Sequence, residues 1–269
     1  MELVALLIYV AIGVVAGFLG GLLGIGGGLV AVPSLLAAFQ ALGLSMEDVM
    51  QVAIGTSLAA MVFTSASSAG AHYSQKSVCW PAFRILAPGV ILGSILGAVI
   101  AIHLPKRGLE LIFGFCEGAI GIYFLYPASV PENEMGLRSI YPAIFAAIGV
   151  GIGGISTLLG IGGGIVTVPI LTAYGMPLRN AISTSAAIGF LIAISGAAAF
   201  LYPALEKHDF SVRTGYIYLP AFICIGLAAS LIAPFGARLA HTLPIRSLQM
   251  VFGVVLIITG IWMIFPWRP

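Results

Sequence analysis

The sequence predicts an all-helical polytopic membrane protein with two homologous halves and about ten transmembrane segments. Three observations lead to this fold class. Apolar residues make up 60% of the 269 residues and charged residues only 7%, whereas a soluble domain usually carries about a quarter charged residues. The mean hydropathy is +1.14, as expected of a chain that lies mostly in a bilayer. A glycine-rich motif occurs twice, about half the chain apart.

The duplicated motif divides the chain into repeats. Gly24 to Pro33 reads GIGGGLVAVP, and Gly160 to Pro169, 136 residues further on, reads GIGGGIVTVP. A second landmark follows in the same order, since AIGTS at 53–57 matches AISTS at 181–185. Repeats of this length can set a whole architecture. We therefore predict a first transmembrane repeat at 1–127, a polar linker at 128–138 and a second transmembrane repeat at 139–269.

The first segment of the chain must be broken. Residues 3–46 carry no charge, and as one helix they would measure roughly 66 Å, about twice the hydrocarbon thickness of a bilayer. Val30 and Val32 favour extended backbone, and Pro33 suits the first turn of a helix. We predict a helix at 3–23, retained as a transmembrane segment rather than cleaved, an irregular stretch at 24–32 and a short helix from Pro33 to about Leu42.

Three further spans complete the predicted first half. The second of them carries Gly89, Gly93 and Gly97 at four-residue intervals, a spacing that lets membrane helices approach closely. The predicted spans lie at 50–71, 80–102 and 109–126, with a loop at 72–77.

The second half repeats this order. Its charge-free run from Ser139 to Leu178 is broken at Gly160–Gly164, as in the first half. The remaining predicted segments are a span at 181–201, the longest polar loop at 203–213, and spans at 215–237 and 245–265.

The number of crossings decides how the halves are related. If each glycine-broken run crosses twice, each half has five crossings and the second half is inverted, which is a common transporter architecture. If each run crosses once, each half has four crossings and the repeats are parallel, with eight segments in all. The length of the runs favours five crossings. Lys and Arg divide almost evenly between the two sides under either count, so the positive-inside rule gives no orientation.

The broken segments are the strongest candidates for a ligand site. Irregular backbone at membrane depth persists only where it is packed in protein or lines a wet cavity. A helix N-terminus attracts anions through free N–H groups, and glycines let a ligand approach that backbone. The alternative is that the glycines serve close helix packing alone. The candidate residues are Gly24, Gly26, Gly27, Gly28 and Pro33, with Gly160, Gly162, Gly163, Gly164 and Pro169.

Duplicated hydroxyl residues could line the same site. Thr56 and Ser57 in the first half match Thr184 and Ser185 in the second, all within predicted apolar spans. They could donate hydrogen bonds to a ligand, or they could bond to a carbonyl one turn earlier or to a neighbouring helix.

Two of the charged residues inside predicted spans are functional candidates. Glu117 lies near the middle of 109–126, and acids within the membrane are costly enough to be functional candidates. It is a candidate for carrying a coupling proton, or else a buried, hydrogen-bonded glutamate. Arg84 is a candidate for an anion entrance, although a side chain so near the end of a span can also extend to the headgroups.

Other functional classes lack support in the sequence. The three cysteines and four histidines show no metal-ligand spacing, no nucleophile triad is apparent, and no basic cluster indicates nucleic acid. We therefore expect no metal, no cofactor and no enzyme activity. The expected partners are a small anionic solute and the lipid bilayer, and a homo-oligomer is left open.

The motifs resemble one known family. LGIGGG at 23–28 and at 159–164, each followed by Val-Pro, together with the Gly-Thr-Ser element at 55–57 and its Ser-Thr-Ser partner at 183–185, look like the sulfite exporter family TauE/SafE. The resemblance extends along the whole chain. It implies a multi-pass protein of the bacterial inner membrane that exports sulfite or organosulfonates such as sulfoacetate.

These expectations combine into one hypothesis. The chain is expected to be a secondary transporter of small sulfur-containing anions that works by alternating access around a midplane site between the two glycine-rich breaks. No nucleotide-binding motif is present, so an ion gradient or the membrane potential would drive it. The alternatives are a passive anion channel and a membrane-embedded scaffold without transport.

Overall fold

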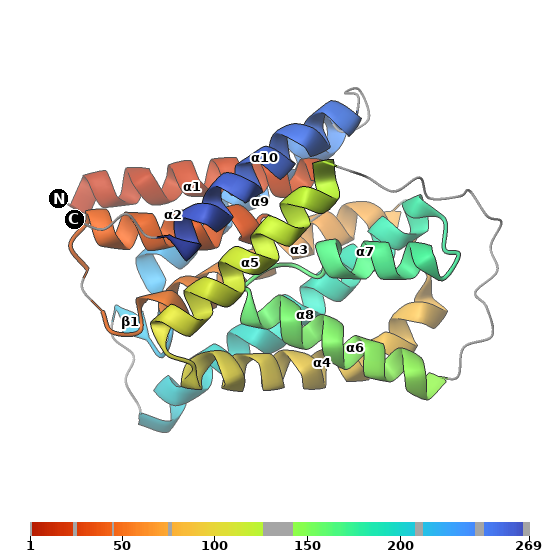
Figure 1. The fold of residues 1–269 in the computed structure, drawn as a ribbon, viewed down its shortest axis with the longest axis horizontal. Helices are drawn as coiled ribbons and strands as arrows, with labels where there is room; N and C mark the ends of the chain where they lie inside the picture. Colours follow the sequence, from red (N-terminus) through yellow and green to blue (C-terminus); the bar gives the residue numbers. More distant parts are fainter. Residues whose placement is uncertain are drawn as a thin grey trace.

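The computed structural model describes residues 2–23, 26–44, 46–74, 77–125, 142–207, 212–239 and 245–265. Within these residues the protein is an all-helical bundle, apart from one two-stranded antiparallel ribbon. Figure 1 shows the helices running back and forth along one long direction, with both chain termini marked at the same end. The predicted linker at 128–138 lies outside the described residues.

The helices follow the predicted order in both halves, whereas the two short strands were not predicted. Helices of the first half are α1 (Glu2–Leu23), α2 (Gly28–Ala41), α3 (Val49–Ser74), α4 (Trp80–His103) and α5 (Lys106–Leu125). Elements of the second half are α6 (Pro142–Leu158), α7 (Gly164–Ala173), α8 (Leu178–Lys207), β1 (Arg213–Thr214), β2 (Ile217–Tyr218), α9 (Leu219–Leu239) and α10 (Ile245–Ile264).

Six of the described helices are long and apolar enough to cross a membrane. They are α1, α3, α4, α5, α8 and α9. Helices α2 and α7 are shorter, with 14 and 10 residues, or about 21 Å and 15 Å at 1.5 Å per residue. Each of these two helices is therefore shorter than a hydrocarbon core of about 30 Å.

The predicted helix start at Pro33 is wrong, and the matching Pro169 does not begin a helix either. Helix α2 begins at Gly28 and α7 at Gly164, so both prolines lie inside helices. The N–H groups of Val30 and Ala31 bond to the Gly27 carbonyl, which starts the helix where extended backbone was expected. The packing of Val32, which is fully buried, outweighs its local preference for extended backbone.

The end of α8 and the start of α9 also differ from prediction. Helix α8 continues to Lys207, and α9 begins at Leu219 rather than near residue 215. Between them, Arg213 pairs with Tyr218 and Thr214 with Ile217. Gly215 turns this short ribbon at a φ of +59°, a conformation that favours glycine.

Each half packs against the other through close glycine contacts. A Cβ added at Gly93 of α4 would lie 2.1 Å from the Val150 carbonyl oxygen of α6, and one at Gly17 of α1 would lie 2.5 Å from Ala229 Cα of α9. The predicted close approach of Gly89, Gly93 and Gly97 to a neighbouring helix is confirmed, with α6 as the neighbour.

The same contacts fix the helix directions. Along α4 and α6 the contacting residue numbers rise together, so these two helices are parallel, and α1 and α9 are parallel for the same reason. Helix α3 is antiparallel to α8, because Leu58 meets Gly196 whereas Ser65 lies near Gly189. Contacts between α5 and α10 pair Gly114 with Gly260 and Gly121 with Gly253, so these helices are antiparallel as well.

Candidate functional site

The two glycine-rich breaks meet inside the bundle. Helices α1 and α2 form a hairpin whose tip holds Gly26 and Gly27, and α6 and α7 form the matching hairpin. A Cβ added at Gly26 would lie 3.4 Å from Gly162 Cα, and one at Gly28 would lie 2.3 Å from the Gly160 carbonyl oxygen. In Figure 1, α2 extends from this meeting point toward the end with the termini and α7 toward the other end.

Backbone conformation explains why glycine is needed at these tips. Gly26, Gly27 and Gly160 have φ values of +78°, +76° and +63°, where a side chain causes strain. At Gly27 a Cβ would also lie 2.4 Å from the Ala16 carbonyl oxygen. Part of the glycine pattern therefore builds the hairpin tips.

A small cavity lies where the tips meet. Its volume is about 20 Å³, which is room for roughly one water molecule. The lining residues come from α1, α3, α7, α8, α9 and both tips: Gly20, Gly21, Gly26, Thr64, Ser65, Gly162, Gly163, Gly164, Ser185, Ala186, Gly189 and Ala233. None of them is charged.

The cavity wall carries donors of hydrogen bonds. Gly163 and Gly164 form the N-terminus of α7, which has no side-chain cap, and the first N–H groups of a helix have no partner within the helix. Ser185 is completely buried, and its hydroxyl has no hydrogen-bond partner in the described structure. A buried polar group without a partner is costly, so this hydroxyl suits a ligand or water in the cavity.

The hydroxyls of Thr56 and Thr184 have other contacts. Thr56 Oγ1 accepts a hydrogen bond from Tyr218 N, and Thr184 Oγ1 accepts one from Cys79 N, both at 2.9 Å. Thr56 therefore holds the residue just before α9, and Thr184 holds the residue just before α4, so each threonine contacts the opposite half. Ser57 donates to the Gly160 carbonyl at 3.0 Å and so ties α3 to the opposite hairpin tip.

Not all predicted site residues line the cavity. Gly26, Gly162, Gly163, Gly164 and Ser185 do. Gly28, Ser57 and Gly160 lie at the tip contact beside it. Gly24 lies outside the described residues.

Sequence reasoning missed several lining residues. Thr64 and Ser65 follow Ser57 by two helical turns, and Gly189 follows Ser185 by about one turn. Residues at these intervals share a helix face. The signal was therefore present in the spacing of small and hydroxyl residues around the two duplicated serines.

Glu117 and Arg84 do not line the cavity. Glu117 lies in α5, completely buried, and neither carboxyl oxygen has a hydrogen-bond partner in the described structure. It faces α10, where a Cβ added at Gly260 would lie 3.3 Å from Glu117 Cβ. Arg84 lies one turn inside α4 and is exposed.

The described residues contain no group of three His, Cys, Asp or Glu side chains placed to hold a metal ion. The cysteines Cys79, Cys116 and Cys224 are free thiols. The cavity chemistry is therefore that of backbone and hydroxyl groups.

Comparison with known proteins gives one family match. Residues 9–263 match the family model described as "Sulfite exporter TauE/SafE". The chain is 33% identical over 261 residues to a "Probable membrane transporter protein" of Haemophilus influenzae, covering 95% of this chain and 97% of the relative. It is 28% identical to the "Probable membrane transporter protein YunE" of Bacillus subtilis, covering 96% and 97%. A protein of Methanocaldococcus jannaschii with a similar name is 26% identical, with 97% and 96% covered.

Proposed function

The chain belongs to the TauE/SafE sulfite exporter family, and on this premise we propose that it exports small sulfur-containing anions such as sulfite or sulfoacetate as a secondary transporter. The family and the relatives make it a multi-pass membrane transporter rather than an enzyme. The proposed location is the bacterial inner membrane.

The observation that carries the proposal is the cavity between the hairpin tips. It combines the N-terminus of α7 with the unpartnered Ser185 hydroxyl, and its lining holds no carboxylate. Sulfite and sulfonates spread negative charge over several oxygens, and backbone N–H groups at a helix start can bind such groups without a buried cation. A neutral, donor-lined site fits that class of ligand.

The helix directions support an inverted repeat. Helices α3 and α8 carry the matched Thr-Ser elements and run antiparallel, and so do the equivalent helices α5 and α10. Because equivalent helices of the two halves run in opposite directions, an odd number of membrane crossings per half is favoured. The two broken hairpins then enter the membrane from opposite sides. Because α2 and α7 are short, we propose that each hairpin tip ends within the membrane near the middle of the bundle.

The size of the cavity supports alternating access. A space of about 20 Å³ holds roughly one water molecule and is too small for a sulfonate. The hairpin tips therefore have to separate for a ligand to bind, and a permanently open anion channel is less well supported than a transporter with a closed intermediate state.

The test is uptake of labelled sulfite and sulfoacetate into proteoliposomes, with and without an imposed pH gradient, comparing wild type with Gly189→Ala. A Cβ at Gly189 would lie 3.6 Å from Gly163 N and 4.0 Å from Ser65 Oγ, so the methyl group fills the cavity without a clash. Alanine also favours a helix over glycine by about 1 kcal/mol. The variant should fold normally and lose uptake by about tenfold, which corresponds to about 1.4 kcal/mol of binding.

The matched control is Gly151→Ala, because Gly151 also lies within a helix but is exposed, with no atom within 4 Å of an added Cβ. It should transport normally. Saturable uptake of sulfur anions, but not chloride, supports the proposal. Uptake that follows the anion gradient without saturation or coupling indicates a channel, and no uptake by the folded wild-type protein favours the scaffold alternative.

A further inference from the structure

The two halves differ in length at one end of the bundle. Between Pro33 and Thr56 the first half has eight more residues than the second half has between Pro169 and Thr184. Between Thr184 and Leu243 the second half has eleven more than the first half has between Thr56 and Leu104. The extra residues fall between Pro33 and the start of α3, and in the last turns of α8 and the connection to α9. Since α3 and α8 are antiparallel, both insertions lie at the same end.

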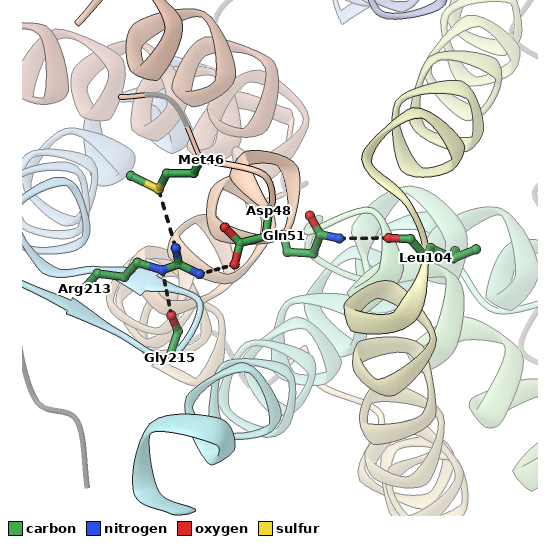
Figure 2. A network of polar contacts seen from close by, with 6 residues as sticks. All are labelled: Met46, Asp48, Gln51, Leu104, Arg213 and Gly215. Atoms are coloured by element: carbon green, nitrogen blue, oxygen red, sulfur yellow. Dashed lines mark hydrogen bonds and ion pairs between the residues drawn. The ribbon is translucent and has the colours of Figure 1, made fainter. Parts of the chain in front are cut away.

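The two insertions are joined by an ion pair. Arg213 of β1 contacts the Asp48 carboxylate beside the start of α3 and the Met46 sulfur at 3.8 Å, while its Nε donates to the Gly215 carbonyl. Figure 2 shows the Arg213 side chain reaching from the β-ribbon to Met46 and Asp48. We call this end, residues 46–48 with 212–218, the ribbon face.

A second contact supports the ribbon face from the side. Gln51 donates to the Leu104 carbonyl at 2.8 Å and so ties α3 to the turn between α4 and α5 (Figure 2). The first turn of α3 is thus held to β1 on one side and to the α4–α5 turn on the other.

The opposite end of the bundle is built from the shorter versions of the same connections. There, Asn180 donates to the Ser77 carbonyl at 2.9 Å. A cavity of about 260 Å³ lies beside this hydrogen bond, lined by Val78, Cys79, Trp80, Pro81, Gly175, Met176 and Asn180. Among the described residues, an ion pair therefore joins the connections at one end, and a cavity lies between them at the other.

We propose that Arg213 and Asp48 form the gate of the ribbon face, and that the structure is the state in which this gate is closed while the opposite face is partly open. This inference rests on the proposed transport function, because a gate is needed only if a solute passes. The pair must break for the central cavity to reach the ribbon face.

The exposure of the pair suits a gate. The Arg213 and Asp48 side chains are 34% and 30% exposed, so water can solvate both charges when they separate. A partly exposed ion pair stabilises a structure only weakly and is screened by salt. It can therefore open during each cycle, whereas a fully buried pair would resist separation.

The test measures how fast a buried cysteine behind the gate is alkylated in the full-length protein. Ala53 lies in α3, just over one turn beyond Asp48, and is completely buried. In a background with Cys79, Cys116 and Cys224 replaced by serine, Ala53→Cys should react slowly with a water-soluble maleimide. Adding Asp48→Asn or Arg213→Gln should raise the rate about tenfold, and the charge swap Asp48→Arg with Arg213→Asp should restore slow labelling.

Arg107→Gln is the matched control. Arg107 also forms an ion pair, with Glu110, and donates to carbonyls of α10. Because these partners lie in α5 and α10 rather than in the ribbon face, the loss of Arg107 should leave the labelling of Ala53→Cys unchanged. If single gate variants that elute as folded protein label no faster than wild type, or if the swap labels as fast as the single variants, the gate proposal is wrong.

The reciprocal readout uses the native Cys79 at the opposite face, with the other two cysteines replaced. Breaking the ion pair should favour the state open at the ribbon face and slow Cys79 labelling. Neither readout needs a known substrate. Changed labelling without sulfur-anion uptake would keep the gate and reject the proposed substrate, whereas normal uptake with unchanged labelling would reject the gate alone.

Discussion

Ser185 combines a buried, unsatisfied hydroxyl with a place in the wall of the central cavity. Its hydroxyl is completely buried, has no partner in the described structure and lines the central cavity. Its sequence counterpart Ser57 instead donates to the Gly160 carbonyl. Two residues at equivalent positions therefore have different surroundings, and only one of them faces the cavity with an unused hydrogen-bond donor.

Replacing Ser185 by alanine should change stability and transport in opposite directions. Removing an unsatisfied buried hydroxyl should raise the free energy of unfolding by about 1 kcal/mol, while uptake of the anion falls. Thermal unfolding in detergent and proteoliposome uptake measure the two effects. Ser195→Ala is the control, because Ser195 lies in the same helix and bonds to its own Leu191 carbonyl; equal uptake by both variants would contradict a ligand role for Ser185.

Glu117 is the second residue for which the structure suggests a test. A buried carboxylate without a partner is unfavourable when ionised, which is the basis for the proposal that Glu117 carries the coupling proton. Glu117→Gln should abolish the stimulation of uptake by a pH gradient while leaving exchange of labelled for unlabelled anion across the membrane. If the variant still responds fully to the gradient, Glu117 does not carry the coupling proton.

At the scale of helices and hairpins, the glycines have two distinct tasks. Some provide positive φ at the hairpin tips, as at Gly27, and others let helices from different halves touch, as at Gly93. The sequence pattern predicted the second task from the four-residue spacing. It could not predict where α2 begins, because burial of Val32 within the core and the left-handed Gly27 outweigh the local preferences of valine and proline.

Substitution of Gly93 by alanine should destabilise the contact between α4 and α6. The added Cβ would lie 2.1 Å from the Val150 carbonyl oxygen, so the helices must move apart, at a cost of about 1–3 kcal/mol. Thermal unfolding measures the loss. Gly118→Ala, where nothing lies within 4 Å of the new atom, should be neutral or stabilising, and equal melting temperatures for the two variants would contradict the packing argument.

At the scale of the whole molecule, composition and the duplicated motif were sufficient to predict the helical membrane fold and the family, and both predictions are confirmed. The cavity was only partly predictable. Gly163 and Ser185 could be chosen from their duplication, and helical spacing places Thr64 and Ser65 on the face of Ser57 and Gly189 on the face of Ser185. That these two faces meet is decided by the antiparallel packing of α3 and α8. Tertiary contacts of this kind are not contained in local spacing.

The proposed inverted repeat predicts a membrane topology. Both chain termini should lie on one side, and the linker at 128–138 should lie on the other. An epitope placed in the linker and one at either terminus should therefore be digested from opposite sides in oriented vesicles. Digestion of both epitopes from the same side would support the alternative with four crossings and parallel repeats.

The contacts of α1 with α9 and of α4 with α6 also constrain biosynthesis. The glycine face of α1 receives its partner only when residues near Ala229 have been made, about 200 residues later. At roughly 5–20 residues per second, α1 waits on the order of 10–40 s in the membrane with that face unpaired. The first half is therefore a poor candidate for independent folding, and a chain truncated before α9 should be recognised and degraded by membrane quality control.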